Sequence, residues 1–492
     1  MISISLALLL ACGPKAPVSP AVVANPRATM PEPLAPRPFE LPTPATATLK
    51  NGIPVVVVEN HEVPLVYVNV VLRSGSWTDP VGKPGLAAAT FDLMAEGAGG
   101  MDAAALSAAQ RRIGASLSTG AGSDGSYISI SCLSEKLPEA LDLLATVLIR
   151  PDFPESEWEL LRKKRLQDLA SARNDPRSIS ARTWAVLSYG NTYLGHLSNE
   201  EAFKAMSTAD LKAWHLANVA PRHALVTVGG ATSLAEITPL LDEKLGGWIR
   251  AGDELPPLPS VESLPAPAQT RIFLVDKPGA TQSNLRVGRF VGSRTDPDYW
   301  AFELANLAIG GMFTSRINMV LREEKGWTYG SRSGSDEGYL PGRWAVSASV
   351  VREATADSVA EIRKQLADSL GERPITQEEL DYGRGYMLGT WPLRFENPGS
   401  LLGETTKIWR YGLAEDFLSS TPDKLRAVTL EQAQAAWSKH VDPGMMDILV
   451  VGDAAVIREP LQALGLPIVE LLPDAKPLPE TKPLPETKPK TR

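Results

Sequence analysis

Between residues 47 and 472, short runs of apolar and β-branched residues alternate with longer segments whose apolar positions recur at helical spacing. In the first half this pattern predicts strands at 53–59, 65–72, 127–133 and 226–230, and helices near 86–94, at 137–149 and from 153 onward. A mixture of strands and long helices predicts an α+β fold in which helices cover one face of a sheet.

The same order of elements recurs in the second half. Strands are predicted at 272–276, 283–291, 344–351 and 449–452, and helices at 299–321, 356–370 and from 375 onward. The segments FPESEWELL and ITQEELDYG, which open matching helices, lie 222 residues apart, and Gly229 and Gly452, which close matching strands, lie 223 apart. So steady an offset predicts two copies of one domain, at 47–254 and 269–472, joined by a Pro-rich linker at 255–268.

The two ends of the chain differ from this repeated region. An apolar run stops at Leu9-Leu10-Ala11-Cys12-Gly13, which resembles a bacterial lipobox, so we expect a lipoprotein signal peptide at 1–12 and lipidation of Cys12. This run is far shorter than the roughly 20 residues that span a bilayer. The proline-rich segment 13–46 is then a tether, and 473–492 a disordered tail with a repeated Lys-Pro-Leu-Pro-Glu-Thr. These features place the protein at the periplasmic face of a bacterial envelope, with Gly13 favouring the outer membrane.

Charge and motif content exclude several function classes. The chain has 49 Lys and Arg against 57 Asp and Glu, a net charge of −8, which argues against a general nucleic-acid binder. The basic run 162–165 is read as a solvated helix face and the lone Cys132 as core. No phosphate-binding loop, nucleophile elbow, His-Glu-x-x-His or cysteine cluster is present, and the five histidines are scattered.

Several segments together resemble the insulinase-like, or pitrilysin, metallopeptidase family, which includes the subunits of the mitochondrial processing peptidase. They are Gly85-Leu86-Ala87, YGNTYLG at 189–195, VTVGG at 226–230 and GGMFTSRINMVLREEKGWTYG at 310–330. The resemblance extends over roughly residues 47 to 470. It implies two homologous domains, each a mixed, largely antiparallel sheet covered by helices, as in the fold of the mitochondrial processing peptidase.

In catalytic members of that family the helix after Gly-Leu-Ala carries His-x-x-Glu-His, in which two histidines bind zinc, the glutamate is the general base and a downstream acid completes the metal shell. The resemblance places Ala88 and Asp92 at the histidine positions, Phe91 at the base and Asp168 at or near the downstream acid. Alanine cannot bind a metal and phenylalanine cannot accept a proton. We therefore expect no zinc in this chain and no peptide hydrolysis by the chain alone.

The second half keeps the other part of the family pattern. An Arg and a Tyr seven residues later, here Arg322 and Tyr329, reach the zinc site of a facing domain in family members and hold the substrate. Guanidinium and phenol groups both donate hydrogen bonds to a peptide carbonyl or oxyanion. Arg316 is interpreted as a residue that positions the helix.

The resemblance thus implies a non-zinc-binding, substrate-binding subunit of a heterodimeric peptidase, which supplies Arg322 and Tyr329 to a zinc-bearing partner chain that cleaves unfolded peptides. One alternative is a catalytically silent scaffold or peptide-binding protein of the same fold. Another is a hydrolase with an unusual metal site built from Asp92, Asp168 and a distant histidine.

Overall fold

The computed structural model describes residues 39–258, 264 and 267–478, and residues from Leu41 onward form one compact unit. Most of the predictions for the ends of the chain, including the signal peptide and Cys12, lie outside the described residues, as does most of the linker. No helix among the described residues is both long and apolar enough to cross a membrane.

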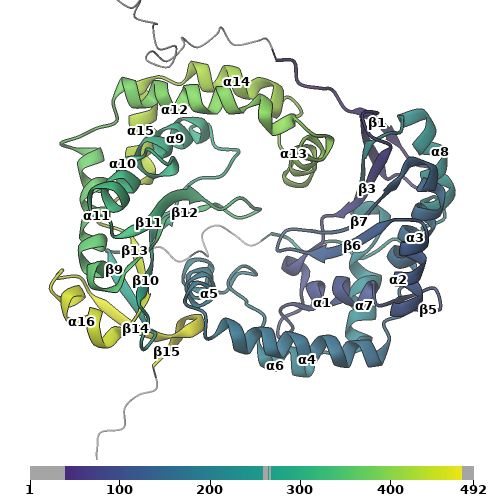
Figure 1. The fold of residues 1–492 in the computed structure, drawn as a ribbon, viewed down its shortest axis with the longest axis horizontal. Helices are drawn as coiled ribbons and strands as arrows, with labels where there is room; N and C mark the ends of the chain where they lie inside the picture. The colour runs from purple at the N-terminus through teal and green to yellow at the C-terminus, as the bar shows by residue number, and fades with distance from the viewer. Residues whose placement is uncertain (1–38, 259–263, 265–266, 479–492) are drawn as a thin grey trace, which may run out of the picture. The chain divides into compact units, whose positions relative to one another are not determined.

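Each half of the chain builds one large sheet (Figure 1). In spatial order, the strands of the first sheet are β1 (Ala45–Thr48), β2 (Pro54–Glu59), β8 (Ala224–Gly230), β3 (Leu65–Leu72), β7 (Ser126–Leu133) and β6 (Ser116–Ala121). Those of the second are β11 (Thr328–Ser335), β12 (Arg343–Val351), β10 (Gln282–Phe290), β13 (Asp447–Gly452), β9 (Arg271–Asp276), β14 (Ile468–Leu472) and β15 (Lys476–Pro477). A two-stranded ribbon pairs β4 (Gly97–Ala98) with β5 (Met101–Asp102).

The two sheets repeat one topology. The order β2-β8-β3-β7-β6 in the first sheet matches β9-β13-β10-β12-β11 in the second, strand for strand along the chain. In each, the first of these pairs is parallel and the other three are antiparallel. The predicted α+β class, with mixed and largely antiparallel sheets, is confirmed, and the topology agrees with the duplication inferred from sequence.

Helices of the same half cover one face of each sheet. The first half contains α1 (Leu86–Met94), α2 (Ala103–Arg112), α3 (Leu137–Ile149), α4 (Glu155–Ala172), α5 (Pro176–Tyr189), α6 (Glu200–Ala205), α7 (Thr208–Asn218) and α8 (Leu234–Leu245). The second contains α9 (Tyr299–Asn306), α10 (Arg316–Asn318), α11 (Thr355–Leu370), α12 (Gln377–Thr390), α13 (Pro398–Tyr411), α14 (Phe417–Ala427), α15 (Leu430–His440) and α16 (Ala454–Gln462). Alternate strand residues such as Val66, Val68 and Val70 point toward these helices and form the main core of their half.

Part of the opposite face of each sheet is covered by a helix from the other half. α5 packs on β10 and β13, where Ile179 and Trp184 join Phe273, Leu449 and other buried residues of the second sheet. α13 packs on β2 and β8 of the first sheet. There Leu402 joins Val56 and Leu225 in a buried cluster. The two halves therefore complete each other's cores.

The exchanged helices α5 and α13 are equivalent in the duplication. Their first and last residues are both 222 positions apart, the offset found elsewhere in the repeat. Each helix begins with a proline directly after its N-cap residue. The side chain of the N-cap Asp175 accepts the Ser178 N–H, and that of the N-cap Asn397 accepts the Ser400 N–H. The exchange is therefore a property of the repeated unit, used twice.

An arginine also stacks on a tryptophan at each crossing. The Arg343 guanidinium lies 4.0 Å from the Trp184 ring centre, and the Arg73 guanidinium lies 4.4 Å from that of Trp409. Arg73 also donates a hydrogen bond of 2.8 Å to the Trp409 carbonyl. Cation–π contacts of this kind add a directional interaction to the apolar packing.

The structure departs from the sequence prediction at three places. The helix predicted at 299–321 is α-helical only to Asn306, continues as a π-helical turn at Leu307–Gly311, and is interrupted at 312–315 before α10. In the π-helical turn, Gly310 lies so close to β11 that a Cβ would collide with the Ser333 side chain. The predicted disordered tail begins with ordered residues, since Arg182 binds Asp474 at 2.7 Å and β15 follows directly. β1 starts at Ala45, two residues inside the predicted tether.

The exchange predicts a stability effect at Leu402. Because this side chain is only 6 % exposed between α13 and the first sheet, L402A should lower the free energy of unfolding by about 2 kcal/mol or more. L393A is the matched control, since Leu393 is 65 % exposed and its truncation should cost less than about 0.5 kcal/mol. Urea unfolding followed by tryptophan fluorescence measures both, and equal losses would contradict the packing role.

Candidate functional site

The helix that holds the family's zinc ligands, α1, is held at its start by the half-buried acid Asp79. Gly85 precedes it with a φ of 95°, a conformation that favours glycine. The Asp79 carboxylate accepts the N–H groups of Gly85 and Ala87, both at 2.8 Å. Burial raises the pKa of Asp79 to about 7, although these backbone donors lower it. The Asp79 side chain thus accepts two of the backbone N–H groups at the helix start that have no partner within the helix.

The face of α1 that would carry catalysis holds none of the required groups. Phe91 is fully buried and packs edge-on against Trp214, with ring centres 6.1 Å apart. Ala88 and Asp92 lie half-buried on the neighbouring positions. The residue at the general-base position is therefore part of the core.

Asp92, the one acid left on this face, forms an ion pair with Arg165 of α4. Asp168 lies on the same helix, is exposed, and makes no ion pair with a described residue. At this position the family pattern has a zinc ligand, whereas here the Asp92 carboxylate pairs with the Arg165 guanidinium. An oxygen that already accepts from a guanidinium is a poor ligand for zinc, which also prefers nitrogen and sulfur.

The described residues contain no group of three or more His, Cys, Asp or Glu that could hold a metal ion. The buried His215 is committed to the Leu148 carbonyl at 2.9 Å, and burial lowers its pKa to about 4. His440 binds Asp298 at 3.0 Å, far along the chain from Asp92. The residues present do not fit zinc, and the alternative of Asp92, Asp168 and a histidine has no such cluster in the described part of the chain.

Arg322 and Tyr329 lie at the surface of the second half. Arg322 belongs to a π-helical turn, Met319–Glu324, that follows α10, and its guanidinium stacks 4.5 Å from the centre of the Phe313 ring. It also pairs with the neighbouring Glu323 at 3.4 Å. Tyr329, on the edge strand β11, is 92 % exposed. Both side chains are accessible to solvent, and the interactions described for them do not include the α1 face.

Arg316 holds this region in place. Its Nε donates to Glu379 of α12 at 2.6 Å, and its Nη2 donates to the Pro374 carbonyl at 2.9 Å. The side chain is 8 % exposed, so it cannot readily reach a substrate. This geometry is that of a positioning residue.

Three residues of these sites escaped the sequence analysis. Arg165 was read only as part of a solvated basic face, since nothing in the sequence links it to Asp92, 73 residues earlier. Asp79 stands outside the helix that it caps. Phe313 gave no signal beyond its place beside the Gly-Gly pair, yet its ring supports both Arg322 and Arg332.

Comparisons with known proteins agree with this arrangement. The family model described as insulinase (peptidase family M16) matches residues 54–196, and that described as peptidase M16 inactive domain matches residues 205–385. The chain belongs to the M16 family. It carries the fold of that family, with Ala88, Phe91 and Asp92 at the positions of the zinc ligands and general base, and its second half matches the model described as the inactive domain.

Relatives of this M16 chain carry different descriptions. An uncharacterized zinc protease of Mycobacterium tuberculosis is 23 % identical over 81 % of this chain and 90 % of its own length. A non-peptidase homolog of Helicobacter pylori is 22 % identical over 82 % of this chain and 92 % of its own. Among solved structures, a peptidase M16 inactive domain of Pseudomonas fluorescens has a TM-score of 0.76 at 24 % identity, covering 83 % of this chain and 98 % of that one.

The degenerate site predicts weak zinc binding. After incubation with zinc and removal of free metal, the purified chain should retain well below one zinc per molecule, because Ala88 offers no ligand and Asp92 is already paired. A chelator should leave the melting temperature unchanged, since a metal that binds only the folded state would raise it. One tightly held zinc per chain, measured by atomic emission, would contradict this.

Asp79 predicts a pH dependence of stability. Its folded-state pKa of about 7 lies above the value of about 4 for an unfolded Asp, so its contribution is fully present below about pH 4 and is lost as pH rises through about 7. The stability of the wild type relative to D79N, which does not titrate, should fall across this window by about 1 kcal/mol or more. A difference that is flat with pH in denaturant titrations would show that Asp79 keeps an ordinary pKa.

Proposed function

We propose that this chain is the non-zinc-binding, substrate-binding subunit of a heterodimeric M16 peptidase. In this proposal a partner chain carries the intact zinc motif, and Arg322 and Tyr329 of this chain reach its site in trans. The two groups donate hydrogen bonds to the carbonyl of the peptide being cleaved and stabilise the negative charge that develops on its oxygen. The substrates are unfolded peptides, which alone can present an extended backbone to such donors.

One observation carries the proposal: the donor pair is open to solvent while the metal position is filled. Tyr329 is almost fully exposed on an edge strand, and Arg322 is held out by stacking on Phe313. In the same chain, Asp92 is neutralised by Arg165. A chain with one part of the machinery and without the other fits a role that a partner completes.

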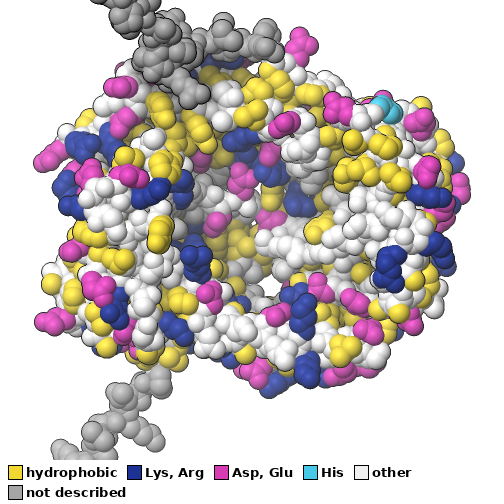
Figure 2. Space-filling view, viewed as in Figure 1, with side chains coloured by type: hydrophobic (Ala, Val, Ile, Leu, Met, Phe, Trp, Pro, Cys, Tyr) yellow, Lys and Arg dark blue, Asp and Glu magenta, His cyan; other side chains and the backbone are white. Residues whose placement is uncertain are grey.

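The charge distribution fits peptides better than nucleic acid. Acidic and basic side chains are interspersed over the face of the described residues in Figure 2, which carries no broad patch of one sign. With a net charge of −8, nothing here resembles the cationic footprint of a nucleic-acid binder. The proposal includes lipidation at Cys12, which would hold the heterodimer at the periplasmic face of a membrane, with the outer membrane favoured.

The test is a peptide-cleavage assay on this chain co-expressed with an M16 relative that carries His-x-x-Glu-His. R322A should lower kcat of the complex by about 100-fold, as removal of an oxyanion donor does. R426A is the matched control, because Arg426 is an exposed arginine of α14 paired only with Asp423, and it should leave kcat unchanged.

Two outcomes would overturn the proposal. Full activity of the R322A complex would leave the scaffold function in its place. Cleavage by this chain alone, abolished by a chelator, would mean that it holds a metal site of its own.

A further inference from the structure

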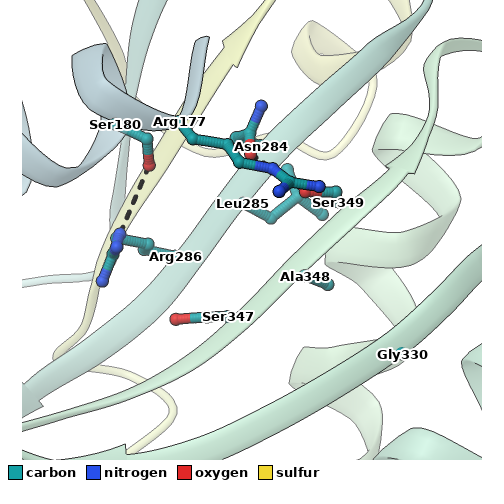
Figure 3. A pocket seen from close by; sticks show the side chains of 9 residues that line it. All are labelled: Arg177, Ser180, Asn284, Leu285, Arg286, Gly330, Ser347, Ala348 and Ser349. Carbon is teal, nitrogen blue, oxygen red and sulfur yellow. Dashed lines mark hydrogen bonds between the residues drawn. The ribbon is translucent and has the colours of Figure 1, made fainter. Parts of the chain in front are cut away.

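A cavity of about 280 Å³ opens between α5 and the face of the second sheet that α5 covers. Its polar side chains come from both halves of the protein (Figure 3): Arg177 and Ser180 from α5, and Asn284, Arg286, Ser347 and Ser349 from β10 and β12. We refer to these six residues as the arginine cavity. Because α5 belongs to the first half and β10 and β12 to the second, the cavity lies where the helix exchange brings the two halves together.

The arginine cavity holds two cations and no acid. Among the described residues, no carboxylate lies within 4.0 Å of the Arg177 or Arg286 guanidinium. Arg286 is half-buried, and its Nε donates to Ser180 Oγ at 3.3 Å, a neutral acceptor. Burial lowers the pKa of Arg286. The negative charge of Asp336 acts in the opposite direction, but Asp336 and Arg286 do not form an ion pair. A cation that loses water without gaining an anion is an unfavourable arrangement that a bound anion would relieve.

The neutral groups around these cations are mainly donors. Ser349 Oγ donates to Asn284 Oδ1 at 2.9 Å, which directs the Asn284 amide N–H groups away from that contact. Asn284 Nδ2 and Ser347 Oγ make no hydrogen bond with a described residue. The donors that line the cavity are thus the exposed Arg177, the half-buried Arg286, the Asn284 amide and the Ser347 hydroxyl. A carboxylate accepts several such bonds at once.

The position of the cavity connects it with the proposed function. Gly330 lines it and directly follows Tyr329. A peptide held by Arg322 and Tyr329 could therefore extend along β11 toward Arg177 and Arg286. A volume of about 280 Å³ accommodates one residue rather than a folded segment.

We propose that the arginine cavity binds a carboxylate of the peptide substrate, either the C-terminal α-carboxylate or an Asp or Glu side chain. The peptide nature of the ligand rests on the proposed function, whereas the anion preference rests on the cavity alone. The subunit would then select peptides that carry a negative charge at a fixed distance from the bond that is cut.

The test measures binding to this chain alone, without a partner and without cleavage. Three versions of one short neutral peptide carry an uncharged fluorophore: a free C-terminal acid, a C-terminal amide, and an amide with one internal Glu. Fluorescence anisotropy should give the acid, the Glu peptide or both an affinity ten- to a hundredfold higher than that of the neutral amide, the range for charge-assisted hydrogen bonds. R286Q should remove this difference.

R289Q is the matched control, since Arg289 lies on the same strand, outside the cavity, and pairs with Asp442 at 3.8 Å. It removes the same charge and should keep the discrimination. The two charged peptides identify which carboxylate is bound. Equal affinity for all three peptides, the same loss in R289Q as in R286Q, or inorganic phosphate binding where neither charged peptide binds would overturn the proposal.

These outcomes are independent of the cleavage assay. If R322A leaves the activity of the heterodimer intact while R286Q abolishes discrimination, the carboxylate site stands and the trans-acting role fails. If the reverse holds, Arg322 and Tyr329 act in cleavage without a carboxylate anchor in this cavity.

Discussion

Each sheet of this protein carries apolar residues on both faces, and the helices of its own half cover one of these faces. The reciprocal placement of α5 and α13 satisfies this constraint, since each helix buries the face that the opposite half leaves open. Burial of apolar area is the main favourable term in folding, so neither half keeps its full core without the other. This is why residues from Leu41 onward form one compact unit although their topology repeats.

The exchange also brings buried polar groups to the junction of the halves. Asp124 of the first half accepts hydrogen bonds from Tyr193 at 2.6 Å, from the Tyr339 backbone at 2.9 Å and from Tyr411 at 3.3 Å. Two of these donors belong to the second half. A buried carboxylate satisfied from both sides fixes the register of the junction, because moving either half would leave it unpaired. The arginine cavity is also lined by residues of both halves, but its lining contains no carboxylate comparable to Asp124.

Local features of the fold could be predicted from the sequence because they depend on local signals. Alternating strands such as 65–72 and the repeat offset were visible in the residues. The family resemblance then showed that Ala88 stands in place of a zinc ligand and Phe91 in place of the general base. The helix exchange was not, because Ile179 and Trp184 have the same helical spacing whichever sheet they pack on.

The other features that the sequence did not predict also depend on contacts between residues far apart in the chain. The π-helical turn at Leu307–Gly311 lies where Gly310 closely approaches Ser333 of β11, and the ordered start of the tail is held by Arg182, almost 300 residues before its partner Asp474. In the candidate site, the family resemblance and the residue types at its positions predicted that Ala88 and Phe91 could not serve a metal shell. They did not predict that Arg165 supplies the counter-charge.

The α1 face with Phe91 and Asp92 and the surface with Arg322 and Tyr329 differ in how much they contribute to the stability of the fold. Asp92 needs a counter-charge because it is half-buried, and the guanidinium of Arg165 provides a single fixed one with no open coordination position for water. Phe91 and Trp214 fill the adjacent space, so this part of α1 is explained by stability alone. Tyr329 is not explained in this way, since a side chain that is 92 % exposed contributes little to folding. Its exposure on β11, the edge strand of the second sheet, supports the proposed contact of Tyr329 with a partner or substrate.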